Sequence, residues 1–150
     1  MITVILVGVG TMLLCLLLQA GLLVRAGLYY QNHTSWVDSP SVLASLGVVA
    51  MVTLILVLGN LAQGAIWAAL YIVLGEFDDF ANAFYHSLVN FSTLGYGDIV
   101  MSHQWRLLGP LQAINGVLMI GVTTGAVSFA ARDSLGRTQT QRNRTQVSHP

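Results

Sequence analysis

Three long apolar runs dominate the chain, and each is long enough to form a membrane-spanning helix. Residues 1–24 and 41–75 contain no charged residue, and a third run covers 107–131 between Arg106 and Arg132. An α-helix rises 1.5 Å per residue, so roughly 20 apolar residues cross the hydrocarbon core of a bilayer. The pattern therefore predicts an all-α membrane protein with three spans.

The first apolar run has two interpretations, a retained helix or a cleaved signal peptide. The start MITVILV has no basic residue, and LQAGLLVRAG is a poor cleavage site for a signal peptidase. A retained helix over 1–24 is therefore favoured, followed by a loop over 25–40.

The segment 76–104, between the second and third runs, does not match a spanning helix. It opens with acidic residues, and residues 80–91 then carry apolar positions at helical spacing over too short a length to span. Asp78 and Asp79 are expected to cap this half-length helix, because acids favour a helix N-terminus. Irregular backbone at membrane depth is tolerated only inside protein or along a water-filled path. The stretch that follows the short helix is therefore expected to line such a path.

The overall composition supports a position in a bilayer. The chain of 150 residues is 55% hydrophobic and 8% charged, with a mean hydropathy of +0.70, whereas soluble domains carry about 25% charged residues. The net charge is zero, which offers no basic field for a nucleic-acid partner. Residues 133–150 are polar and rich in Arg, Gln and Thr, and we expect them to be disordered. So small a chain cannot enclose a wide aqueous path alone, so a transport role would require an oligomer.

Residues 92–98 read STLGYGD, which resembles the selectivity-filter signature T-V-G-Y-G-D of the tetrameric pore-loop potassium channels. A glycine-rich turn would explain the two glycines but not the full order of residues. The order of segments also matches this family: an outer helix (41–75), a pore helix (80–91), a filter (93–98) and an inner helix (107–131). The resemblance covers 41–132 and implies a homotetramer in the lipid bilayer, with 1–24 as a helix additional to the two-transmembrane form.

The resemblance implies that K⁺ is the permeant ion, with no cofactor, small-molecule substrate or enzymatic activity. Channels of this family replace the hydration shell of K⁺ with rings of backbone carbonyls. By resemblance these K⁺-binding rings come from Thr93, Leu94, Gly95 and Tyr96, with the Thr93 hydroxyl as the innermost ring. Gly95 and Gly97 allow the backbone angles that such rings require.

By the same resemblance, other side chains support the filter or guard its outer mouth. Tyr96 is expected to pack against pore-helix aromatics such as Tyr85, and Asp98 is expected to raise the cation concentration at the mouth. His86 stands where many relatives have tryptophan. One hypothesis is a hydrogen bond from His86 to Asp98 that makes the filter sensitive to pH; a hydrated histidine is the alternative.

Two further positions depart from the family pattern. Leu94 replaces the commoner valine of the signature, so that packing behind the filter must differ while the carbonyl is unaffected. Val89 occupies a position where some relatives place a glutamate that pairs with the filter aspartate. The carbonyl rings are therefore expected to be intact, and the support behind them is expected to differ.

Three glycines interrupt the inner helix. Gly116 lies where relatives place a gating hinge, because glycine weakens a helix, and close packing is the alternative. Gly121 and Gly125 form a G-x-x-x-G pattern, for which packing is favoured. Helical spacing places Ile120 and Thr124 on the face of Gly116, and this face is expected to line a cavity.

A few polar residues lie inside the apolar runs. For Asn60, Gln63 and Asn115 we favour hydrogen bonds between helices over any role in ion binding. The lone cysteine, Cys15, cannot form a disulfide within the chain. No span carries regularly spaced arginines, so no voltage sensor is evident.

The distribution of charge predicts an orientation in the plasma membrane. Potassium filters face outward, so the acidic segment 76–104 is expected outside. The tail from Arg132 onward carries four of the six arginines and is expected in the cytoplasm, as the positive-inside rule requires. The loop 25–40 is then cytoplasmic, and the N-terminus lies outside.

The leading hypothesis is a potassium-selective channel that conducts K⁺ passively. Two alternatives stay open: a weakly selective channel for monovalent cations, and a non-conducting regulatory membrane subunit. The intact order from Thr93 to Asp98 argues against the first, and a complete filter would be unexplained in the second.

Overall fold

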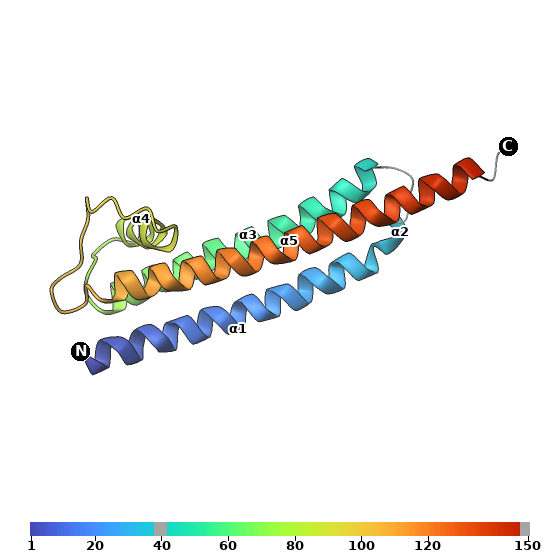
Figure 1. Cartoon of the computed structure of the whole chain (residues 1–150). Helices are drawn as coiled ribbons and strands as arrows, with labels where there is room; N and C mark the ends of the chain where they lie inside the picture. Colours follow the sequence, from blue (N-terminus) through green and yellow to red (C-terminus); the bar gives the residue numbers. More distant parts are fainter. Residues whose placement is uncertain (38–41, 148–150) are drawn as a thin grey trace. The chain divides into compact units, whose positions relative to one another are not determined.

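The computed structural model describes residues 1–37 and 42–147, and these residues form helices and loops without a strand. Three of the helices are long and apolar enough to cross a membrane. The helices are α1 (Ile2–Asn32), α2 (Thr34–Val37), α3 (Val42–Val73), α4 (Phe80–Phe91) and α5 (Leu108–Val147) (Figure 1). The predicted fold class, an all-α membrane protein with a short helix between the second and third spans, is confirmed.

Two helices extend beyond the ends that hydropathy predicted. The helix expected over 1–24 continues to Asn32, and the tail expected to be disordered from 133 is helical to Val147. Hydropathy locates the membrane-embedded part of a helix, whereas arginine and glutamine are good helix formers that let the helix continue past it. Residues 38–41 and 148–150 lie outside the described part, and with them Pro40, a residue type that the sequence favours as the start of the second apolar helix.

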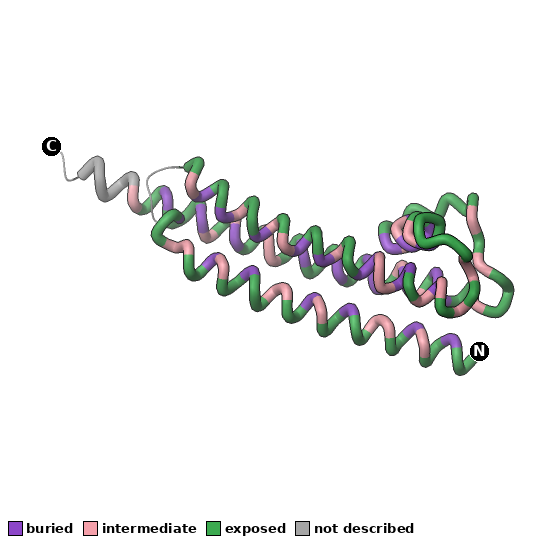
Figure 2. The backbone as a smooth tube through the Cα atoms, turned by 180° about the vertical axis from the view of Figure 1, so that it is seen from behind, coloured by how far each residue is buried: buried purple, intermediate pink, exposed green. Residues whose placement is uncertain are grey.

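The chain divides into two compact units, which are considered separately. The first unit comprises Met1–Ala20 and Leu58–Gly121, and it contains α4 and the loops on either side of it. Buried positions recur at helical intervals along each long helix (Figure 2), as expected for helices that pack along one stripe. The buried core of this unit consists of Val4, Cys15, Trp67, Tyr71 and Leu108.

The second unit comprises Gly21–Val57 and Val122–Pro150. Its polar contacts explain why the start of the C-terminal tail is ordered. The Tyr30 hydroxyl donates to Asp133 Oδ2 at 2.8 Å, and Arg137 Nε donates to the same oxygen at 2.7 Å. The hydroxyls of Ser45 and Thr138, both buried, lie 2.8 Å apart. These contacts hold residues 133–138 in the helix.

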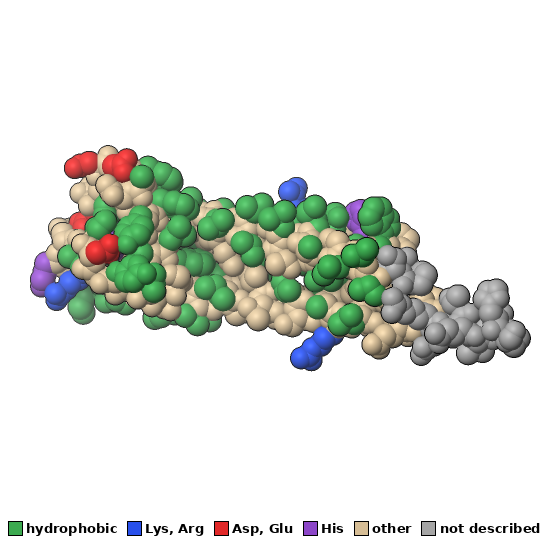
Figure 3. All heavy atoms as spheres, turned by 90° about the horizontal axis from the view of Figure 1, so that it is seen from above, with side chains coloured by type: hydrophobic (Ala, Val, Ile, Leu, Met, Phe, Trp, Pro, Cys, Tyr) green, Lys and Arg blue, Asp and Glu red, His purple; other side chains and the backbone are tan. Residues whose placement is uncertain are grey.

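In the view of Figure 3, apolar side chains cover much of the surface along the long helices, and the acidic side chains that it shows gather at one end. Glu76, Asp78, Asp79 and Asp98 lie in the loops on either side of α4, while Asp133 lies on α5. Membrane lipid or a further subunit would cover the apolar surface. Glu76, at the end of α3, accepts hydrogen bonds from the backbone N–H and the hydroxyl of Ser102, both at 2.6 Å. This carboxylate therefore fastens the loop that leads into α5.

Candidate functional site

The short helix α4 is the element on which the candidate site is built. Asp79 is its N-cap: the backbone there is extended, and Oδ2 accepts the N–H of Asn82 at 3.0 Å. The predicted capping by Asp79 is therefore confirmed, while Asp78 lies one residue outside the cap. The helix ends at Phe91, so the backbone of 93–98, called loop 93–98 below, begins directly after one capping residue.

The first residues after α4 fold back onto its last carbonyl groups. The N–H of Thr93 donates to Asn90 O at 2.9 Å, and the N–H of Leu94 donates to Val89 O at 2.9 Å. The N–H of Gly95 reaches the same Val89 carbonyl at 3.4 Å. The start of loop 93–98 is therefore rigidly attached to the C-terminus of α4.

The backbone of loop 93–98 alternates in handedness. Thr93, Gly95 and Gly97 have φ of 60°, 59° and 72°, whereas Leu94 and Tyr96 between them keep ordinary negative values. Successive carbonyls of a regular strand point to opposite sides, and alternation of this kind lets them face one side instead. A positive φ at Thr93, a β-branched residue, costs on the order of 1–3 kcal/mol, and strain of this kind concentrates at functional sites.

The side chains of loop 93–98 are exposed to solvent in the single chain. Leu94 is 53% exposed and Tyr96 is 66% exposed, so the predicted packing of Tyr96 against Tyr85 stays a prediction. The Thr93 hydroxyl donates to Ser92 O at 2.6 Å. Its lone pairs remain acceptors, so a ring of these hydroxyls around an ion is chemically possible.

The carboxylate of Asp98 is held by Tyr85 rather than by the histidine that the sequence suggested. The Tyr85 hydroxyl donates to Asp98 Oδ2 at 2.6 Å, and the N–H of Ile99 donates to Oδ1 at 3.0 Å. The Tyr85 bond is the main cause that holds the pKa of Asp98 below its ordinary value, and it raises the pKa of Tyr85. Asp98 therefore keeps its negative charge at lower pH than a free carboxylate would.

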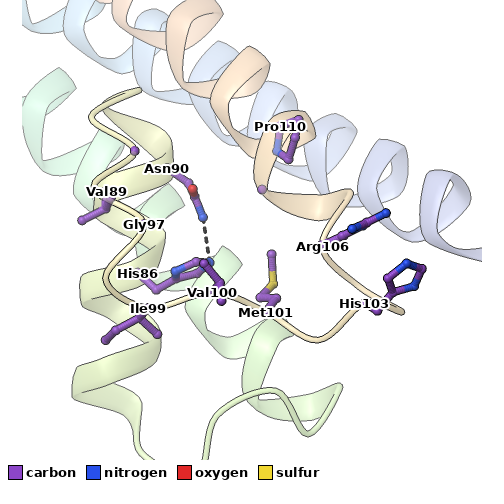
Figure 4. A pocket seen from close by; sticks show the side chains of 12 residues that line it. His86, Val89, Asn90, Gly97, Ile99, Val100, Met101, His103, Arg106 and Pro110 are labelled. Atoms are coloured by element: carbon purple, nitrogen blue, oxygen red, sulfur yellow. Dashed lines mark hydrogen bonds between the residues drawn. The ribbon is translucent and has the colours of Figure 1, made fainter.

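His86 is largely buried, and its Nε2 bonds Asn90 rather than Asp98, so the hypothesised bond to Asp98 is not seen among the described residues; the hydrated ring stays a prediction, because the side chain faces the cavity described below. The side chain is 6% exposed and contacts the rings of Phe77 and Tyr71 at centroid distances of 5.2 and 5.6 Å. Its Nε2 lies 2.9 Å from Asn90 Nδ2 (Figure 4). With the Asn90 amide in this orientation, its nitrogen donates and Nε2 accepts. Burial is the main cause that lowers the pKa of His86.

A cavity of about 530 Å³ adjoins loop 93–98. The backbone of Gly95 and Gly97 forms part of its wall, and His86 and Asn90 face it from α4, as does Arg106 from the loop before α5 (Figure 4). The loop is therefore not packed tightly on this side within one chain, and its position depends on how firmly α4 is held.

The bond between Tyr85 and Asp98 predicts a measurable pH dependence. The pKa of Asp98 is lowered in the folded protein, so its charge and the stabilisation it provides are present above the unfolded pKa and are lost as pH falls through the folded one. Tyr85→Phe removes the main cause of the shift. We expect Asp98 of this variant to become protonated at a higher pH than Asp98 of the wild type.

This prediction is checked by following the Asp98 carboxyl carbon by NMR of isotope-labelled protein while the pH is lowered from about 6 to about 3, which brackets the ordinary carboxylate range. Asp98→Asn provides the control, because it has no charge to lose at this position. Identical titration curves for Tyr85→Phe and the wild type would contradict the prediction.

On α5, Gly116 permits a close approach to the end of α4. A Cβ atom built on Gly116 would collide with the backbone carbonyl of Phe91, lying 2.7 Å from its carbon. No atom lies within 4 Å of a Cβ built on Gly121 or Gly125. The packing of Gly116 against α4 is thus observed, and its role as a hinge stays a prediction.

The remaining predicted residues lie on different surfaces of the chain. Val89 is 7% exposed, beneath the start of loop 93–98. Ile120 and Thr124 are exposed on α5. Their role in lining a cavity stays a prediction.

Sequence reasoning missed a buried polar network behind α4. Tyr71 on α3, Ser87 on α4 and Gln112 on α5 are each 0% exposed and joined by hydrogen bonds. The sequence did indicate Gln63 as an interhelical partner. Its Nε2 donates to Gln19 Oε1 at 2.8 Å, so the predicted interhelical bond of Gln63 is confirmed. The same signal, an amide in an apolar run, would have found Gln112.

Comparison with known proteins identifies the region that contains α4 and loop 93–98. Residues 61–131 match the family model described as Ion channel, a family of two-transmembrane pore-type proteins rather than of enzymes. No curated protein and no solved structure matches the chain significantly. The matched region starts within α3 and ends within α5, so it includes every residue of the candidate site.

Proposed function

Because residues 61–131 match the family model described as Ion channel, we propose that the protein is a potassium-selective channel. The backbone of loop 93–98 carries this proposal. Its alternating handedness at Thr93, Gly95 and Gly97 suits a row of carbonyl groups that face one axis, which is the arrangement that replaces the water around K⁺.

The carbonyls of Thr93, Leu94, Gly95 and Tyr96 would form four successive rings. One chain contributes one carbonyl to each ring, whereas an ion without its hydration shell needs oxygen atoms on all sides. The functional unit is therefore a homotetramer in the lipid bilayer, with loop 93–98 of each subunit at the central axis. The exposure of Leu94 and Tyr96 in the single chain fits side chains that neighbouring subunits would cover.

Acidic residues support an outward-facing position for this end of the pore. Glu76, Asp78, Asp79 and Asp98 all lie close to α4 in the sequence, and Asp98 immediately follows the rings. A ring of four Asp98 carboxylates would raise the local concentration of cations at the entrance. In the plasma membrane this arrangement puts the N-terminus outside and the C-terminus in the cytoplasm.

A flux experiment distinguishes this proposal from the two alternatives. Purified protein in liposomes loaded with K⁺ and diluted into Na⁺ should generate an inside-negative potential without added ionophore, reported by a voltage-sensitive dye. A weakly selective channel would dissipate the gradient without a potential, and a regulatory subunit would give no flux. Either result would contradict the proposal. The mass of the purified complex should correspond to four copies of the 16.1 kDa chain.

A further inference from the structure

A closed set of hydrogen bonds ties α4 to α3 and α5, and Gln112 is at its centre. We propose that Gln112 is a positioning residue, which sets the place of α4 and thereby of loop 93–98 for ion selection. This inference rests on the proposed function, because it assigns Gln112 a part in the same selection of K⁺.

The hydrogen bonds run in one direction around the three helices. The Tyr71 hydroxyl donates to Gln112 Oε1 at 2.5 Å, and Gln112 Nε2 donates to Ser87 Oγ at 2.6 Å. The Ser87 hydroxyl donates in turn to the Gly64 carbonyl at 2.6 Å. The set therefore begins and ends on α3, passing through α5 and α4. Gln112 Nε2 also lies 3.1 Å from Ser87 O.

Each member of this set finds its partners inside the protein, because the three side chains are closed to the surface. Tyr71, Ser87 and Gln112 are all 0% exposed. An amide is the group that both accepts from Tyr71 and donates to Ser87. An apolar side chain of the same length would leave the Tyr71 hydroxyl without its acceptor, and a buried polar group without a partner is unfavourable. The geometry of α4 is thus fixed by the amide of Gln112.

Ser87 lies within one helical turn of the carbonyl groups that hold the start of loop 93–98. The carbonyls of Val89 and Asn90, which follow Ser87 on α4, accept the N–H groups of Leu94 and Thr93 at 2.9 Å. Functional groups must be held to within about 0.5 Å of the productive geometry. A shift of α4 at Ser87 therefore displaces the carbonyl rings, and selectivity is the property that this displacement alters.

The chain offers a matched control in Gln63. This residue is also a glutamine at 0% exposure in the same unit, and its hydrogen bond joins α3 to Gln19 on α1. Gln19 does not lie on α4, so Gln63→Met removes an equally buried amide without releasing Ser87.

The test is the permeability ratio of K⁺ to Na⁺, measured from reversal potentials in bi-ionic solutions. We expect Gln112→Met to lower this ratio at least tenfold, and Gln63→Met to keep it within about twofold of the wild type. Ser87→Ala should lower the ratio by a similar factor, and the double variant should lose no more than either single one, because both changes break the same set of bonds. If Gln112→Met fails to assemble, the permeability ratio of Ser87→Ala alone tests the inference.

Two results would overturn this inference: an unchanged ratio in Gln112→Met or Ser87→Ala, or an equal fall in Gln112→Met and Gln63→Met. The second would mean that loss of any buried amide disturbs the fold in general. The wild-type ratio separates this inference from the proposed function. An unselective wild type overturns the proposed function, whereas a selective wild type with an equally selective Gln112→Met overturns the positioning role alone.

Discussion

Replacing Gly116 by alanine should reduce the number of conducting channels at least tenfold. The new methyl group would occupy the space of the Phe91 carbonyl, so α4 must move away from α5. Overpacking of this kind typically costs about 1–3 kcal/mol, and here the atom that must move belongs to the backbone rather than to a flexible side chain. Because only Ser92 separates Phe91 from loop 93–98, a displacement of Phe91 also displaces the loop.

Gly121→Ala is the matched control, since it makes the same change on the same helix where nothing lies within 4 Å of the added atom. Both substitutions remove a helical glycine, which by itself favours the helix by about 1 kcal/mol. The measurements are the yield of assembled complex on size-exclusion chromatography and the K⁺ flux per assembled complex. A Gly116→Ala protein that assembles normally and differs only in the fraction of time it is open would contradict the packing account and favour a hinge.

The second large effect is expected at Gly97, where the backbone has a φ of 72°. An L-residue in this left-handed region costs about 1–2 kcal/mol, and a tetramer would carry the strain four times. Gly97→Ala should therefore lose most K⁺ selectivity or conduction. No atom lies within 4 Å of the added Cβ, so the effect must come from backbone conformation and not from a collision.

A D-alanine at position 97, introduced by chemical ligation, separates conformation from size. Its preferred φ is positive, so the channel with D-alanine should keep the wild-type permeability ratio while the L-alanine channel loses it. The comparison uses two side chains of identical volume. Equal loss in both forms would show that the methyl group itself is harmful, and would contradict the conformational explanation.

Hydropathy predicted the helices because the pattern of apolar residues is a direct consequence of the bilayer. The limits of α3 and α4 agree closely with the expected 41–75 and 80–91. The C-terminal extension of α5 was missed because its contacts, such as the bond between Tyr30 and Asp133, join residues that are far apart in the chain. Such pairs have no local signature in a single sequence.

The site was predictable in its backbone and less so in its side chains. Glycines at 95 and 97 indicate left-handed conformations by their residue type alone, whereas the positive φ of Thr93 is unusual for a β-branched residue and could not be expected. The predicted partner of Asp98, His86, was wrong, because Tyr85 and His86 are neighbours on α4 and Tyr85 forms the bond. Which of them faces Asp98 depends on the packing of His86 against Phe77 and Tyr71, which no local pattern encodes.

We propose that loop 93–98 selects K⁺ by its backbone carbonyls. Its most direct test is the reversal potential of single wild-type channels in a planar bilayer with K⁺ on one side and Na⁺ on the other. If the carbonyls of loop 93–98 select K⁺, the reversal potential will be close to the limit set by K⁺ permeation alone. A reversal potential near zero, which indicates equal permeation of K⁺ and Na⁺, would contradict it.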